Sequence, residues 1–297
     1  MKLLLTGTTD IGRERDVNED GFVLCPDIAK ADWSLTATNG YVDLSEQGAV
    51  VAVADGMGGA EAGEVASAIA LDTVKQCFAT PLSQLAQQPP AFFQSLVTRA
   101  NETINRHVDT APETTGMGTT LVVAWLVNNP TADSQSPTVT AHVAWCGDSR
   151  GYRYSPEKGL ERITHDHSYV QQLIDSGELT EEEALTHPES NLITRCLGDT
   201  GTSAIADAID TDLQPGDLLL ICSDGLCGYC ADSDIEQIVA RYHDDPAVCQ
   251  EALLQAALDA GGYDNITITI AAIQPSKATA NRSPFATLSA WLKRLFS

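Results

Sequence analysis

The sequence predicts an α+β fold, with antiparallel strands at its core and helices packed over them. Two neighbouring runs, 119–127 (TTLVVAWLV) and 138–146 (TVTAHVAWC), have the apolar, β-branched composition of strands. The segment between them is polar and contains proline, which favours an antiparallel hairpin. Strands that follow one another with no helix between them argue against a purely parallel βαβ plan.

The same kinds of pattern predict further elements. Strand-like runs bounded by Gly, Pro or Asp lie at 50–54, 217–223 and 266–273. Apolar residues at spacings of three and four predict helices over 63–79 and 91–109. A third helix is predicted over 246–260, where Pro246 suits the first turn.

The composition excludes some classes of function. The 297 residues include 17 Lys+Arg and 41 Asp+Glu, so the formal net charge is −24. That charge opposes binding to nucleic acid or to an anionic membrane surface, and it favours cationic partners and metal ions. With 43% hydrophobic residues the chain has an ordinary globular composition, and its length allows a large buried core.

The sequence also indicates a compartment. The first ten residues, MKLLLTGTTD, hold too short an apolar run for a secretory signal, and no apolar stretch is long enough to cross a bilayer. We therefore expect a cytoplasmic monomer whose eight scattered cysteines are buried free thiols. The CxxC spacing at Cys227 and Cys230 has no second CxxC or histidine pair to complete a zinc site.

Composition changes along the chain indicate how it is organised. We expect one domain over 1–274, in which the polar, acidic segment 164–200 is an inserted lid. Residues 275–297 then form a linker and a short amphipathic helix. Such a helix either docks on its own domain, which we favour, or touches a membrane or a partner.

Four aspartates lie at predicted strand ends, each beside or close to a glycine: Asp55, Asp148, Asp224 and Asp264. A single acid in such a place is usually a cap or turn residue. Four gathered at one end of a sheet would repel one another, and burial would raise their pKa values unless cations were present. Oxygen donors of this kind suit Mg²⁺ or Mn²⁺. A fifth acidic group, at residues 18–20, precedes the apolar run FVLC.

Such a site would suit phosphate chemistry. Two metal ions about 3.5–4 Å apart activate a water for in-line attack on phosphorus. The remaining phosphate oxygens need a cation, and Arg15 is a candidate because its guanidinium matches two oxygens. Alternatively Arg15 is a solvated surface charge, since Arg13 and Glu14 lie next to it. Glycine at position 56 would let a carbonyl or a water approach a metal ion without a Cβ in the way.

Six short motifs occur in the order found in the metal-dependent serine/threonine protein phosphatases of the type 2C family. They are RDVNED at 15–20, DGMGG at 55–59, GMGTT at 116–120, GDSR at 147–150, SDGL at 223–226 and DNIT at 264–267. The chain resembles this family from about residue 3 to 273, and its THDHS at 164–168 resembles the bacterial branch. The resemblance implies a central antiparallel β-sandwich flanked by helices on both sides, four layers in all, with two metal ions in a cleft at one end.

The resemblance also implies ligands for those ions. The implied set is Asp55, Gly56, Asp148, Asp224 and Asp264. Asp55 would bridge the two ions, Gly56 would add its carbonyl oxygen, and Asp224 and Asp264 would complete one ion. Asp148, together with Asp224, would bind a weaker third ion.

Three further residues, Arg15, Glu19 and Asp20, are implied to act in catalysis. Arg15 would hold the phosphate, and Glu19 and Asp20 would order water at the metal ions. The implied activity is hydrolysis of phosphoserine and phosphothreonine in proteins, opposing bacterial serine/threonine kinases. Some relatives carry a histidine shortly after the Asp-Gly pair as a proposed proton donor, whereas this chain has Met57 and Ala60, so the donor is unassigned.

Three rival interpretations are weighed against this one. Residues 147–151 match GxSxG, but the serine-hydrolase elbow needs a helix directly after the serine, and the alternating residues after Ser149 suit a strand. A phosphatase fold that lost its metals would be a binding module, yet every implied ligand position keeps an acid or a glycine. A glycosidase lacks the aromatic platform that should accompany its paired carboxylates.

Overall fold

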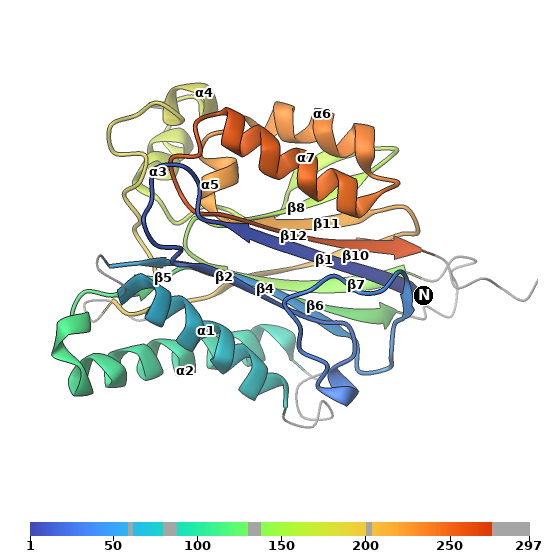
Figure 1. Ribbon diagram of the computed structural model, residues 1–297, viewed down its shortest axis with the longest axis horizontal. Coiled ribbons are helices and arrows are strands. Elements are labelled where there is room, and N and C mark those ends of the chain that lie inside the picture. The colour runs from blue at the N-terminus through green and yellow to red at the C-terminus, as the bar shows by residue number, and fades with distance from the viewer. Residues whose placement is uncertain (59–61, 80–87, 130–137, 200–203, 275–297) are drawn as a thin grey trace, which may run out of the picture.

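The computed structural model describes residues 1–58, 62–79, 88–129, 138–199 and 204–274. These residues form four layers, in which two β-sheets pack face to face and helices cover both outer faces (Figure 1). The predicted α+β sandwich flanked by helices on both sides is confirmed. The predicted C-terminal helix within 275–297 lies outside the described residues.

The first sheet has the strand order β3-β1-β12-β11-β8-β9. Its strands are β1 (Lys2–Asp10), β3 (Val42–Asp43), β8 (Arg150–Ser155), β9 (Gly159–Arg162), β11 (Leu218–Cys222) and β12 (Ile266–Gln274). Every pairing is antiparallel, and β1 and β12 are paired over their full length from Lys2↔Gln274 to Asp10↔Ile266.

The second sheet has the order β10-β7-β6-β4-β2, and the short β5 pairs with the end of β4. Its strands are β2 (Asp20–Cys25), β4 (Ala49–Met57), β5 (Gly118–Thr119), β6 (Leu121–Asn129), β7 (Thr138–Cys146) and β10 (Asp207–Leu213). β6 and β7 pair antiparallel from Leu121↔Cys146 to Asn129↔Thr138, as predicted for this hairpin.

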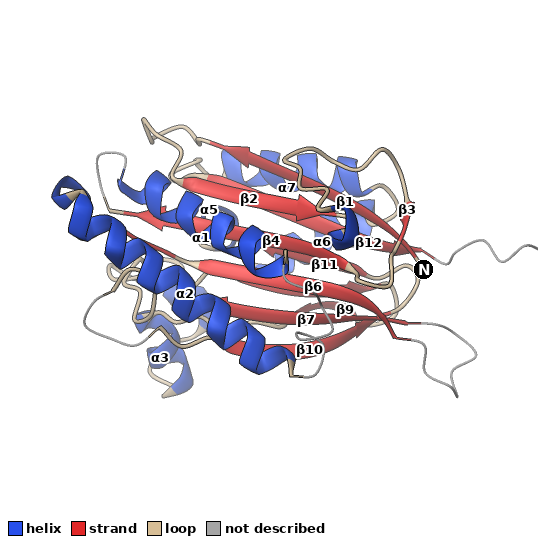
Figure 2. Cartoon of the chain, turned by 90° about the horizontal axis from the view of Figure 1, so that it is seen from below, coloured by secondary structure: helices blue, strands red, loops and turns tan. Residues whose placement is uncertain are grey.

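Helices cover the outer face of each sheet (Figures 1 and 2). α1 (Ala62–Phe78) and α2 (Pro89–Thr110) lie on the second sheet, whereas α6 (Asp232–Tyr242) and α7 (Pro246–Asp259) lie on the first. The predicted helices at 63–79, 91–109 and 246–260 are α1, α2 and α7. The shorter helices are α3 (Tyr169–Asp175), α4 (Glu181–Ala184), α5 (Asp224–Cys227) and the 3₁₀ turns η1 (Ile28–Lys30) and η3 (Pro112–Thr114).

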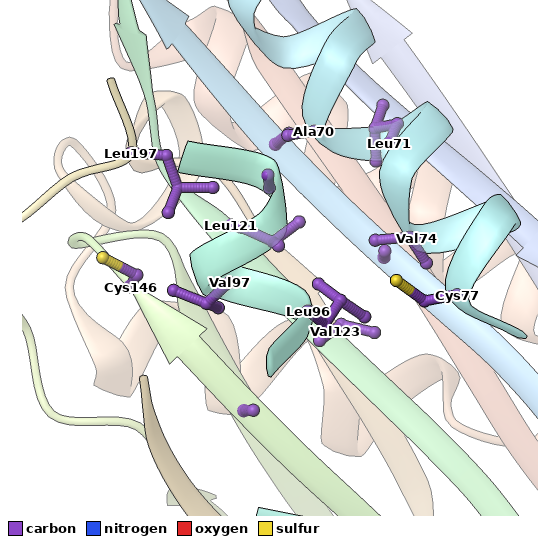
Figure 3. Close-up of a cluster of buried hydrophobic side chains, with 14 of the residues drawn as sticks. Ala70, Leu71, Val74, Cys77, Leu96, Val97, Leu121, Val123, Cys146 and Leu197 are labelled. Carbon is purple, nitrogen blue, oxygen red and sulfur yellow. The ribbon is translucent and has the colours of Figure 1, made fainter. Parts of the chain in front are cut away.

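Strand β4 shows why the apolar run before Asp55 is unbroken. Val50, Ala52 and Ala54 pack toward α1 and α2, in the cluster that Figure 3 shows beneath these helices. Val51 and Val53 point the other way and pack between the sheets. Antiparallel strands usually expose one face, but a four-layer fold covers both, so both sets of β4 side chains are apolar.

Among the helices in the described part of the chain, none is long and apolar enough to cross a bilayer. All eight cysteines are free, as the sequence predicted, and seven of them are buried. Cys196 was also expected to be buried but is partly exposed. The thiols of Cys227 and Cys230 are nearly inaccessible, and burial contributes to raising the pKa of both.

Candidate active site

Strand ends bring the predicted acids to one end of the sandwich. Asp20 begins β2 and is the register partner of Asp55 near the end of β4. Asp148 follows β7, Asp224 begins α5 directly after β11, and Asp264 precedes β12. The charges of Asp20, Asp224, Asp148 and Asp264 all act on the Asp55 carboxyl, so five residues distant in sequence share one electrostatic environment.

Crowding and burial make these acids hard to ionise together. Burial raises the pKa of Asp20 to about 8, against opposing hydrogen bonds from Ser223 and Thr267. Burial followed by the charge of Asp264 raises the pKa of Asp224 to about 6. Burial and neighbouring carboxylates also hold the pKa values of Asp55 and Asp148 well above their ordinary range. A group of acids shifted upward in this way is characteristic of a functional site.

The backbone around Asp55 is held by two buried threonines. Its carbonyl oxygen accepts from Thr120 N and from Thr119 Oγ1, both at 2.8 Å. Its N–H donates to Thr120 Oγ1 at 3.1 Å. These bonds fix the point at which the Asp55 side chain leaves β4, so Thr119 and Thr120 support the site through the backbone.

Packing requires glycine at position 56, in addition to the predicted need for a backbone that a metal ion can approach. A Cβ at Gly56 would collide with the carbonyl group of Gly63, and a Cβ at Gly63 would collide with the Glu19 carboxylate. Glu19 Oε1 accepts from Gly63 N at 3.1 Å, its carbonyl accepts from Ser67 Oγ at 2.7 Å, and its N–H donates to Asn265 Oδ1 at 2.7 Å. Glu19 therefore joins the start of α1 to β4 and to the β12 end.

Arg15 is paired with one of the predicted ligands. Its Nη2 donates to Asp264 Oδ2 at 2.7 Å, and Asp264 Oδ1 accepts from Asn265 N at 2.8 Å. The Asn265 side chain also donates to the carbonyls of Ile11 and Val17, both at 3.0 Å. Asn265 thus holds the loop that places Arg15, which is not an isolated surface charge.

A serine and a threonine support Asp20. Ser223 Oγ donates to Asp20 Oδ2 at 2.6 Å and accepts from Thr267 N at 2.9 Å. Sequence reasoning did not single out Ser223 or Asn265, although both lie inside the motifs SDGL and DNIT. Each is the neighbour of a predicted acid, and that adjacency was the available signal.

Arg150 forms a network that the sequence analysis missed. Its side chain is 13% exposed and pairs with Asp166 at 2.7 Å and with Asp232 at 3.3 Å. The Tyr152 hydroxyl also donates to Asp232, at 2.8 Å. The network joins β8, the segment before α3 and the start of α6. Arg150 is the last residue of GDSR, but its partners are remote in sequence.

A cavity of about 440 Å³ opens beside these acids, and Arg15, Asp148, Asp224 and Asp264 line part of it. No histidine is among the described residues that line it, so the proton donor stays unassigned. Met57 ends β4, and Ala60 lies outside the described residues.

The donor chemistry fits hard divalent cations, although the side chains are partly engaged elsewhere. All side-chain donors are carboxylate oxygens, which Mg²⁺ and Mn²⁺ prefer. Asp148 Oδ1 is buried and has no hydrogen-bond partner among the described residues. Across the described ranges no group of three or more acidic, histidine or cysteine side chains is arranged to hold an ion. Asp264 accepts from Arg15, and Asp20 accepts from Ser223.

The serine-hydrolase interpretation does not fit. Ser149 is 1% exposed, its Oγ is 2.8 Å from Thr120 Oγ1, and the chain continues directly into β8. The elbow geometry requires a helix at that point and an exposed nucleophile.

Comparison with known proteins agrees with this fold. The family model described as protein phosphatase 2C matches residues 37–259. The serine/threonine phosphatase stp of Listeria innocua is 32% identical over 88% of this chain and 92% of its own length. The crystal structure of the Mycobacterium tuberculosis serine/threonine phosphatase PstP/Ppp is 29% identical, with a TM-score of 0.71 over 93% of this chain and 100% of its own.

A second structure, the catalytic domain of PstP in complex with two manganese ions, is 28% identical, with a TM-score of 0.69 over 93% of this chain and 100% of its own. Sequence similarity covers 88% of the chain and fold similarity covers 93% of it. The chain belongs to the protein phosphatase 2C family.

Proposed function

We propose that the chain is a metal-dependent phosphatase that hydrolyses phosphoserine and phosphothreonine in proteins. The observation that carries the proposal is the group of carboxylates gathered at one end of the sandwich, with Arg15 beside them in an open cavity. Family membership and relatives named serine/threonine phosphatases give the proposal its substrate class.

Metal ions would be held by Asp55, the Gly56 carbonyl, Asp224 and Asp264, with Asp148 and Asp224 serving a weaker third ion. When bound, such ions polarise phosphoryl oxygens and lower the pKa of water. The related PstP structure contains two manganese ions, which makes Mn²⁺ the first metal to test and Mg²⁺ the second. The raised pKa values of Asp55 and Asp148 are consistent with acids that need cations beside them to ionise.

The chain's own groups then position the substrate. Arg15 would hold the phosphate, which requires its guanidinium to leave Asp264 or to share it. Asp20 would orient water, with Ser223 fixing its carboxylate. Glu19 would contribute mainly by fixing the start of α1, because its carboxylate already accepts from Gly63 N. The proton donor to the leaving oxygen remains open.

The described part of 164–200 would form the lid of a domain spanning 1–274. It returns to the site end at Leu197, which forms a β-bridge with Thr119, and Val170 of α3 and Ala184 of α4 line the cavity. Exchanging this segment should therefore alter rates on protein substrates more than rates on small aryl phosphates. Phosphorylated proteins, including serine/threonine kinases, are the proposed partners, and we place the enzyme in the cytoplasm as a monomer.

The decisive experiment is hydrolysis of p-nitrophenyl phosphate with and without Mn²⁺. The Asp224→Asn variant should lose at least ~100-fold in kcat/KM, since even changes to groups that only support metal ligands cost about 10–100-fold. Asp109→Asn, on the exposed surface of α2, is the control for the same chemical change.

The rival function is a phosphatase-like module that binds phosphoproteins without cleaving them. Metal-independent turnover, or an Asp224→Asn variant as active as its control, would contradict the proposed mechanism. Absence of turnover with retained binding of a phosphopeptide would favour the binding module.

A further inference from the structure

The cavity beside the acids extends well beyond them. Its outer part is lined by α3, α4 and the segment that joins α5 to α6. Apolar side chains of this part include Val170 and Ile174 of α3 and Leu185, which follows α4. A cavity of about 440 Å³ is larger than a phosphate group, so a neighbouring side chain of the substrate can also enter it.

Charge in the outer part is unbalanced. The carboxylates of Asp166, Glu181, Glu182 and Asp232 line it, whereas Arg150 is the basic residue among the described residues of this part. Arg150 is already paired with Asp166 and Asp232. Glu181 pairs with Arg162 at 2.7 Å, and the Glu182 carboxylate has no hydrogen bond or ion pair among the described residues.

The wall also contains an unused buried acceptor. Gln171, on α3, is 3% exposed and lines the cavity. Its Nε2 donates to Asp175 Oδ1 at 3.0 Å, and its Oε1 has no hydrogen-bond partner among the described residues. A buried acceptor without a partner costs free energy. Because this oxygen is almost closed to solvent, a donor reaches it only if the Gln171 side chain shifts toward the cavity.

We propose that this outer part is a subsite for an arginine side chain that flanks the phosphorylated residue of the substrate. A guanidinium has five N–H donors and no acceptor, which matches a space with surplus acceptors and negative charge. The methylene groups of arginine would lie along Val170, Ile174 and Leu185. This inference rests on the proposed function, because it assumes that the phosphate lies near Arg15.

Binding and hydrolysis are measured separately, so that the two proposals can fail independently. Fluorescence anisotropy with Mn²⁺ gives the Kd of peptides that carry a phosphonate analogue of phosphothreonine. Each peptide has one arginine at a position from three residues before to three residues after the analogue. The matched peptide has citrulline, a neutral isostere, at the same position. Hydrolysis of p-nitrophenyl phosphate reports the proposed activity in parallel.

We expect arginine to be preferred over citrulline by about 10-fold at one position, as a charge-assisted hydrogen bond predicts. Glu182→Gln should reduce that preference about 2–5-fold, because the carboxylate is exposed, and Glu182→Lys should reduce it further. Glu102→Gln removes the same charge from α2, on the opposite face, and should leave the preference unchanged.

Two results would overturn the subsite. One is equal affinity for arginine and citrulline peptides at every position. The other is a higher affinity for arginine that is the same at every position and that Glu182→Gln and Glu102→Gln reduce equally. The net charge of −24 alone would produce such a result. A positional preference without hydrolysis of p-nitrophenyl phosphate would support the subsite and count against the proposed activity.

Discussion

At the scale of single residues, Arg15 is the group whose contacts bear most directly on the proposed chemistry. It holds the carboxylate of Asp264 although its side chain is 48% exposed. An ion pair as exposed to water as this one contributes at most about 1 kcal/mol to stability, so a phosphate dianion can compete for the guanidinium. The pair is therefore compatible with a switch of Arg15 from Asp264 to substrate.

This predicts opposite effects of Arg15→Ala on substrate and metal. The KM for p-nitrophenyl phosphate should rise ~10-fold or more, because the phosphate loses a charge-assisted contact. The apparent Kd for Mn²⁺ should fall slightly, by roughly 2–5-fold, because Asp264 is released from an exposed pair. Activity titrated against substrate and calorimetry with Mn²⁺ measure the two.

Arg13→Ala serves as the control, since the Arg13 side chain is exposed and pairs at 3.8 Å with Asp259, which is not one of the predicted site acids. A much weaker Mn²⁺ affinity in Arg15→Ala would instead mean that Arg15 positions Asp264 for the metal, and the phosphate-binding role would be wrong.

At the scale of elements, the contact between the end of β4 and the start of α1 controls the shape of the site. The sequence interpretation gave Gly56 a role as a carbonyl ligand. The structure adds that no side chain fits there, because the Gly63 carbonyl lies against Gly56. Glu19, which directly precedes β2, accepts a hydrogen bond from Gly63 N and so holds the start of α1 in place. Both roles are compatible, because the missing Cβ that lets α1 lie close to Gly56 also leaves its carbonyl unobstructed.

Gly56→Ala should therefore destabilise the protein even without metal. Pushing α1 away from β4 is overpacking, which costs about 1–3 kcal/mol in the free energy of unfolding. Urea denaturation in EDTA measures the loss. Gly151→Ala is the comparison, because a Cβ there meets its nearest atom, Thr164 Cγ2, at 3.3 Å. If Gly56→Ala and the parent are equally stable in EDTA, close packing does not require the glycine. The carbonyl-ligand role would then be the remaining reason for it.

At the scale of the whole molecule, His167 ties the segment before α3 to the second sheet. Its ring is 5% exposed, and its Nδ1 accepts from Gly147 N at 3.0 Å. Nε2 therefore carries the proton and donates to Asp207 Oδ2 at 3.2 Å. Burial lowers the pKa of His167 despite the opposing effect of Asp207. A protonated ring would bring a second N–H against the Gly147 N–H.

The sign of the resulting pH dependence follows from this lowered pKa. An unfolded histidine titrates near pH ~6.5, so on acidification the unfolded chain binds the proton first. The contribution of His167 to stability is present above that pH and is lost as the pH falls through the folded pKa. The urea midpoint of the parent should therefore fall more steeply between pH 7 and pH 5 than that of His167→Gln.

His165→Gln is the matched control for this measurement, since that ring is 54% exposed. Parallel pH curves for the parent and His167→Gln would show that His167 does not couple protonation to folding.

Much of this molecule was predictable because local patterns carry the information. Runs of apolar and β-branched residues identified β6 and β7, and the polar segment between them correctly indicated a hairpin. Short or polar strands such as β10, with its sequence DAIDTDL, were not predicted, because pairing with β7 rather than composition makes them strands. α6 was also missed, since its apolar positions are few and its packing on the first sheet defines it.

The sequence by itself determined the types of the long apolar elements, their apolar faces and the candidate acids, because each depends on neighbours within a few residues. Only the tertiary structure decided which groups meet. The pairing of Arg15 with Asp264 joins residues 249 positions apart, and that of Arg150 with Asp232 joins residues 82 apart. No local period encodes such contacts, because they arise when separate strands end at the same edge of a packed sandwich.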